Sequence, residues 1–91
     1  MAAKYVLFYD FANDVMSKAP AHIPAHSARL NAFHARGTLL MGGVFANPQD
    51  DGAMMIFTTR EAAEEFATGD PYVLNGVVRA WHVREWNEAV A

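Results

Sequence analysis

The sequence of 91 residues contains no cysteine, few basic residues and no long apolar run. Without cysteine the chain has no disulfide scaffold, no thiolate zinc site and no cysteine nucleophile. Its 7 Lys and Arg against 10 Asp and Glu give a net charge of -3, whereas a nucleic-acid-binding domain normally presents a basic face. No stretch approaches the roughly 20 apolar residues of a membrane span. We therefore expect neither nucleic acid nor a membrane among its partners.

The composition is that of one folded domain. Hydrophobic residues make up 53% of the chain and charged residues 19%, a balance that a disordered chain would reverse. There is room for one core, so residues 1–91 are expected to form a single domain with a tail over residues 87–91. The N-terminus leads directly into a strand-like run, without the apolar segment and cleavage site of a signal peptide, which predicts a cytoplasmic protein.

Four segments have the composition of β-strands. Lys4–Tyr9 and Ala53–Phe57 are apolar almost throughout, which is typical of strands buried on both faces. Thr38–Phe45 contains two adjacent glycines, and Val77–Trp86 carries charged side chains among apolar ones. Both of these features are typical of strands at the edge of a sheet.

Two helices are predicted between these strands. The first covers residues 25–36, because a proline suited to a first helical turn precedes it and a glycine suited to a helix end follows it. The second is predicted to begin at a capping box of Thr58 and Glu61 and to end near Gly69. Residues 11–20 are predicted to form a loop that includes a helical turn, and the segment from Asn47 to Gly52 a hairpin loop.

The order of these elements is β-α-β-β-α-β, an antiparallel split β-α-β arrangement with the first and third strands at the centre of the sheet. The two apolar strands would then be central and the other two would be edges, in agreement with their compositions. Two helices can cover only one face of such a sheet, while its central strands are apolar on both. We therefore expect a homodimer in which a second copy covers the open face.

His26 is the first candidate site residue. It shares one stripe of the first helix with Leu30, Phe33 and Gly37, at the spacing i, i+4, i+7 and i+11, so it should point toward the core or a pocket beside it. One interpretation is a histidine at the edge of the core, hydrogen-bonded to a backbone carbonyl. The other is a general acid or base, because a partly buried imidazole can exchange protons near neutral pH.

Asp70 is the second candidate. Aspartate before Pro71 is typical of a helix N-cap, and it predicts a short helical turn that Gly76 closes. A cap needs no catalytic role. One oxygen of a capping carboxylate can nevertheless accept a hydrogen bond from an imidazole and orient it, so the two roles are compatible.

The histidines also allow a metal site as an alternative. His22 and His26 stand four residues apart, but Pro24 between them starts the helix and leaves His22 outside it. His82 and Asp70 would have to complete the ligand set, because no acidic residue lies near the two histidines in the sequence. We therefore expect no metal and no cofactor. A dinucleotide fingerprint and a phosphate-binding loop are also absent from the sequence.

Taken together, these motifs resemble the YciI-like, or YCII-related, family. The resemblance is carried by Pro24-Ala25-His26, Arg29-Leu30, Gly37-Thr38-Leu39-Leu40, Gly42, Glu61-Ala62-Ala63, Asp70-Pro71-Tyr72 and Gly76-Val77. It extends from the first strand to Trp86. It implies a ferredoxin-like α+β fold with a four-stranded antiparallel sheet and helices on one face, which dimerises through the sheet as in the dimeric α/β-barrel superfamily.

The resemblance also implies a function. The family is proposed to place a His–Asp pair in a pocket, which makes His26 and Asp70 the candidate catalytic residues and Arg29, Tyr72 and Gly42 candidates for substrate binding. A few relatives look like lyases or dehydrochlorinases of chlorinated ring compounds, and the wider superfamily includes isomerases. The implied activity is acid–base chemistry without a cofactor, an elimination or isomerisation of a small organic molecule. The alternative is a non-catalytic dimeric protein that binds a metabolite.

The chain departs from the family pattern at two positions. Members often carry arginine three residues before the histidine, where this chain has Ile23. A cation that could bind an acidic substrate is then missing at that place. Members also often have Gly-Pro in the second strand, where this chain has Gly42-Gly43, so the backbone of the pocket wall is expected to differ.

Overall fold

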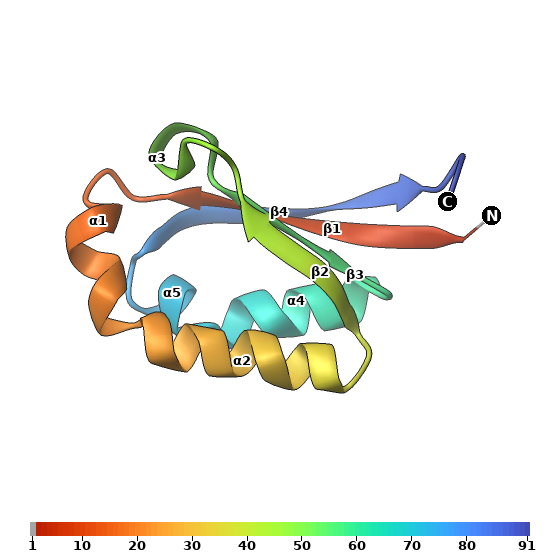
Figure 1. The fold of residues 1–91 in the computed structure, drawn as a ribbon, viewed down its shortest axis with the longest axis horizontal. Helices are drawn as coiled ribbons and strands as arrows, with labels where there is room; N and C mark the ends of the chain where they lie inside the picture. Colours follow the sequence, from red (N-terminus) through yellow and green to blue (C-terminus); the bar gives the residue numbers. More distant parts are fainter. Residues whose placement is uncertain (1) are drawn as a thin grey trace.

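The computed structural model describes residues 2–91, so Met1, where the predicted domain begins, lies outside it. The strands are β1 (Ala3–Phe11), β2 (Leu39–Val44), β3 (Ala53–Phe57) and β4 (Val78–Asn87). They form one antiparallel sheet in the order β2-β3-β1-β4, and the helices lie against one of its faces (Figure 1). This is the ferredoxin-like α+β fold, and the predicted central and edge strands are confirmed.

Two longer helices, α2 (Ile23–Ala35) and α4 (Arg60–Gly69), cover the sheet. Short helical turns complete the chain: α1 (Val15–Lys18), the 3-10 turn η1 (Ala19–Ala21), α3 (Pro48–Asp51) and α5 (Pro71–Leu74). The predicted hairpin loop before β3 therefore contains a helical turn, because Asn47 and the proline that follows it start one. No helix among the described residues is long and apolar enough to cross a membrane.

The start of α4 corrects the predicted capping box. Thr59, and not Thr58, is the N-cap, and its hydroxyl accepts a hydrogen bond from the backbone N–H of Ala62 at 3.1 Å. The N–H of Thr58 instead donates to the carbonyl of Thr38 at 2.9 Å, which keeps Thr58 at the end of the sheet. Glu61 lies in the first turn, where a negative charge favours the helix N-terminus.

The core lies between the sheet and the two longer helices. Phe33 of α2, Phe57 of β3 and Phe66 of α4 meet there, with ring centroids 5.1 Å, 5.6 Å and 6.3 Å apart. Three alanines on the same side of α4 are buried beside them: Ala62, Ala63 and Ala67. These contacts fix α2 and α4 on the sheet and thereby set where the candidate site residues lie.

The opposite face of the sheet, called the outer face below, has neither α2 nor α4 over it (Figure 1). A shallow hollow on it is lined by Val6, Phe8, Met54, Ile56 and Trp86. The exposed fraction of these residues ranges from 4% for Val6 to 50% for Trp86. The central strands therefore carry apolar side chains on both faces of the sheet, and one of these faces is turned away from α2 and α4.

Candidate functional site

Asp70 is the only polar or charged residue of the described chain that is fully buried. Its carboxylate has three partners from three parts of the fold. The hydroxyl of Tyr9 donates to Oδ2 at 2.6 Å, Nδ1 of His26 lies 2.9 Å from each oxygen, and the backbone N–H of Tyr72 donates to Oδ1 at 3.1 Å. A carboxylate removed from water needs such donors. The bond from Tyr72 is the predicted N-cap of α5, so capping and the contact with His26 coexist.

His26 is held in one orientation on two sides. Its ring lies parallel to that of Tyr72, with centroids 3.8 Å apart and planes at 4°, and Nδ1 faces Asp70. Because a carboxylate only accepts hydrogen bonds, Nδ1 carries a proton, and the lone pair of the neutral ring is on Nε2. The side chain is 13% exposed and lines a cavity. This arrangement leaves Nε2 as the nitrogen available to a ligand.

Tyr9 also belongs to the site, although it is not among the site residues predicted from the sequence. Burial, and then the hydrogen bond and charge of Asp70, raise the pKa of its hydroxyl far above the usual range, so Tyr9 stays protonated and donates to the carboxylate. Burial and the charge of Asp70 also raise the pKa of Tyr72. A signal for Tyr9 was available, because a tyrosine inside an apolar central strand needs a partner for its buried hydroxyl.

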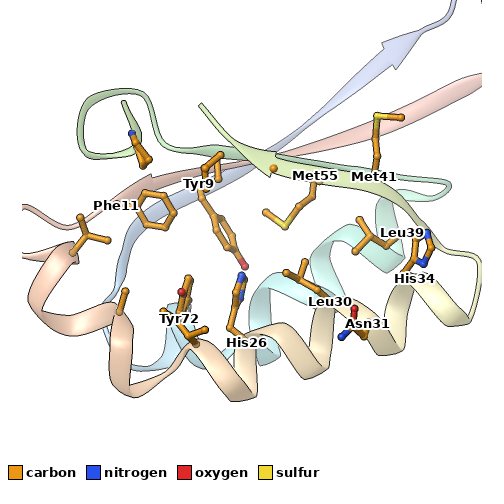
Figure 2. Close-up of a pocket in the computed structure, with 18 residues that line it drawn as sticks. Tyr9, Phe11, His26, Leu30, Asn31, His34, Leu39, Met41, Met55 and Tyr72 are labelled. Atoms are coloured by element: carbon orange, nitrogen blue, oxygen red, sulfur yellow. The ribbon is translucent and has the colours of Figure 1, made fainter. Parts of the chain in front are cut away.

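A cavity of about 500 Å³ lies beside His26, between α2 and the strands β1 to β3 (Figure 2). Its walls are mostly apolar and include Phe11, Leu30, Leu39 and Met55. Within the described chain, no Lys, Arg, Asp or Glu lines it. The volume is within the range of small-molecule sites. The cavity is therefore apolar over most of its wall, and its polar side chains are those of Tyr9, His26, Asn31, His34 and Tyr72.

The three predicted substrate-binding residues lie in two places. Tyr72 and Gly42 line the cavity. A Cβ at Gly42 would lie 2.7 Å from Cγ of Met55, so the glycine makes room for this side chain at the cavity wall. Arg29 does not line the cavity, because its guanidinium turns toward the end of α4 and donates to the carbonyl of Phe66 at 3.1 Å. Arg29 is therefore the one of the three that lies outside the lining of this cavity.

The alternative metal ligands are not brought together. No group of three His, Cys, Asp or Glu side chains in residues 2–91 is close enough to hold a metal ion. His82 lies on the outer face, stacked on Phe8 at a centroid distance of 5.1 Å, while His26 faces the cavity on the other side of the sheet. His22 precedes α2 as its N-cap residue, outside the cavity.

Comparisons with known proteins agree with this architecture. The family model of the YCII-related domain matches residues 3–87. Protein YciI from Escherichia coli O6:H1 and protein YciI from Shigella flexneri are each 35% identical over 83 residues, covering 80% of this chain and 85% of the relative. A solved structure of 5-chloro-2-hydroxyhydroquinone dehydrochlorinase from Burkholderia phenoliruptrix, in complex with 2,5-dihydroxybenzoquinone, has a TM-score of 0.70 and 19% identity, covering 96% of this chain and 95% of that one. That structural similarity shows a shared fold.

Proposed function

Because the chain belongs to the YCII-related family, we propose that it is a small enzyme in which His26 and Asp70 act as an acid–base pair on a small organic ring compound. The observation that carries this proposal is the buried carboxylate of Asp70 on Nδ1 of His26, with the same imidazole at the wall of an apolar cavity. Such a partner fixes the tautomer of the imidazole and stabilises the imidazolium that forms when Nε2 takes a proton.

The reaction class that fits this pair is an elimination or isomerisation begun by proton removal. Nε2 of His26 takes a proton from a C–H or O–H group, and the released electron pair forms a new double bond in the ligand. In an elimination a leaving group then departs with its own electron pair, so the elements of an acid are lost and no electron acceptor is needed. The dehydrochlorinase that shares the fold is named for a chlorinated ring compound, which supports this class of substrate.

The lining of the cavity favours a ligand without charge. Among the described residues no Lys or Arg lines it, and its basic side chains are the imidazoles of His26 and His34. Ile23 occupies the position where members of the family often carry arginine. An unpaired carboxylate moved into such a site costs several kcal/mol, on the order of the penalty measured for buried ions. We therefore expect 4-chlorophenol to raise the melting temperature more than 4-chlorobenzoate does at equal concentration. Equal shifts would contradict the proposed preference.

The proposed chemistry is tested by turnover of lactones, halogenated phenols and halogenated hydroquinones. His26→Gln keeps a planar side chain but removes the base, and we expect it to lower turnover at least about 100-fold. The matched control is His22→Gln, since His22 lies outside the cavity. Equal turnover by wild type and His26→Gln would remove His26 from the mechanism.

The same screen separates catalysis from binding alone. A ligand present at a hundred times its dissociation constant should stabilise the fold by about 2.7 kcal/mol, whether or not it reacts. Stabilisation of the wild type without turnover of any compound would favour the non-catalytic metabolite-binding protein. Turnover that is lost in His26→Gln while ligand-induced stabilisation persists would favour the enzyme.

We also propose that the protein forms a homodimer through the outer face. This face carries Phe8, Met54 and Ile56 on the central strands, and contiguous apolar surface of this kind is typical of an interface. Met54→Lys should therefore give a monomer in light scattering at micromolar concentration. The matched control is Met16→Lys, because Met16 is 74% exposed on α1, away from this face. A monomeric wild type would contradict the proposal.

A further inference from the structure

We propose that Arg29 is a positioning residue, which holds His26 against Asp70 by tying α2 to the C-terminal end of α4. His26 and Asp70 are 44 residues apart and lie on different elements, so their contact depends on how α2 sits against the end of α4. Arg29 lies about one turn after His26 on α2, and it reaches the segment that leads directly into Asp70. The inference rests on the proposed function, since it concerns the same pair.

Two hydrogen bonds make this tie. Nε of Arg29 donates to the carbonyl of Phe66 at 3.1 Å, and Nη2 donates to the carbonyl of Glu65 at 2.8 Å. The carbonyl of Phe66 is among the last four of α4, which lack partners within the helix, and a cation near a helix C-terminus is favourable. The planar fork of the guanidinium reaches two successive carbonyls, which the single ammonium of lysine does not reproduce.

The surroundings fix the guanidinium in this place. Its Cζ lies 4.9 Å from the centroid of the Phe33 ring and 5.6 Å from that of Phe66, both in the core. Gly69, the last residue of α4, leaves the space that the guanidinium occupies, because a Cβ there would lie 2.7 Å from Cζ of Arg29. A larger residue at position 69, next to Asp70, would therefore clash with the guanidinium of Arg29.

The charge of Arg29 also acts at the site. It lowers the pKa of the Tyr9 hydroxyl and so opposes part of the increase caused by burial and by Asp70. Arg29 therefore combines a geometric hold on the segment before Asp70 with an electrostatic influence on Tyr9, which donates to Asp70, and it does so without lining the cavity.

The test reads the tautomer of His26 in the free protein by long-range proton–nitrogen NMR, which needs no ligand. In the wild type we expect the proton of the neutral ring on Nδ1. Arg29→Met should reduce the Nδ1–H form and increase the Nε2–H form. The matched control is Arg36→Met, because Arg36 also stacks on Phe33, at 3.8 Å, but bonds only the exposed side chain of Glu65. Arg36→Met should keep the wild-type tautomer.

Two further variants keep the test decisive if Arg29→Met folds poorly. Arg29→Lys retains the charge and loses the fork, so a partial loss of the Nδ1–H form is expected. Gly69→Ala leaves Arg29 intact but displaces its guanidinium. Gly69 has no positive φ, so alanine does not strain the backbone there. This variant should shift the tautomer of His26 in the same direction as Arg29→Met.

The outcomes separate the inference from the proposed function. A wild-type tautomer in all folded variants of Arg29 and Gly69 would overturn the positioning role and leave the His26–Asp70 pair in place. A wild-type protein in which His26 carries no proton on Nδ1 would overturn the pair itself, and the positioning role with it. A shifted tautomer in the Arg29 and Gly69 variants, but not in Arg36→Met, supports the inference.

Discussion

Tyr9→Phe removes one donor from the buried carboxylate of Asp70 and keeps the aromatic ring in the core. The lost bond is 2.6 Å long, between a residue that is 1% exposed and one that is 0% exposed. A hydrogen bond to a charged group contributes about 1.5–3 kcal/mol. We therefore expect the substitution to lower the free energy of unfolding by this amount at pH 8. Two donors to Asp70 remain, from His26 and Tyr72, so the fold should persist.

The contact between Tyr9 and Asp70 also predicts how the difference in free energy of unfolding between the wild type and Tyr9→Phe changes with pH. In the unfolded chain the pKa of Tyr9 lies near the ordinary tyrosine value of 10.0, whereas its folded-state pKa is raised well above that. Above pH 10 the unfolded wild type therefore releases a proton that the folded wild type keeps, and its free energy of unfolding falls by about 1.4 kcal/mol per pH unit. Tyr9→Phe lacks this proton, so the two proteins should become equally stable between about pH 11 and pH 12.

Both the loss of stability at pH 8 and its change with pH can be measured by urea unfolding followed by circular dichroism. The measurements are made at pH 8, 10 and 11 and at one protein concentration. Tyr5 and Tyr72 are present in both proteins, so their ionisation cancels in the difference. A Tyr9→Phe protein as stable as the wild type at pH 8 would refute the strength assigned to the bond. A difference that stays constant from pH 8 to pH 11 would refute the protonated, buried state of Tyr9.

Thr59→Ala should lower the free energy of unfolding by about 1 kcal/mol, whereas Thr58→Ala should stay within about 0.5 kcal/mol, because only Thr59 caps α4. Equal losses in urea unfolding would contradict the corrected cap. Gly42→Ala should push the side chain of Met55 into the cavity and weaken binding of 4-chlorophenol severalfold in calorimetry. Gly43→Ala, whose methyl would meet nothing within 4 Å, should retain more of the affinity. The reverse order would show that Met55 does not shape the site.

Much of the fold could be predicted because local patterns and sheet topology agree. The apolar run of Ala53–Phe57 coincides with β3, and the glycine after α2, Gly37, adopts the expected positive φ of 83°. The errors lie at element boundaries. The cap shifted from Thr58 to Thr59 because both threonines suit the position, and only the pairing of Thr58 with the sheet end decides between them.

The site could be predicted only in part. Periodicity placed His26 on the inward stripe of α2, but its distance from Asp70 depends on tertiary packing, for which the sequence carries no local signal. The resemblance to a family supplied that pairing as an expectation. Arg29 shows the opposite case. The resemblance makes it a candidate for substrate binding, and only the structure shows that its guanidinium donates to two carbonyls near the end of α4.

Stability and the proposed chemistry are coupled in this site, because one buried carboxylate caps α5, accepts from Tyr9 and lies against Nδ1 of His26. A substitution at Asp70 would disturb all three at once, so loss of activity in such a variant would not identify a catalytic role. Tyr9→Phe and His26→Gln separate the effects. The first lowers stability and leaves Nε2 of His26 beside the cavity, so activity measured well below its melting temperature should survive. The second removes the proposed base, so activity should be lost even where the protein is fully folded.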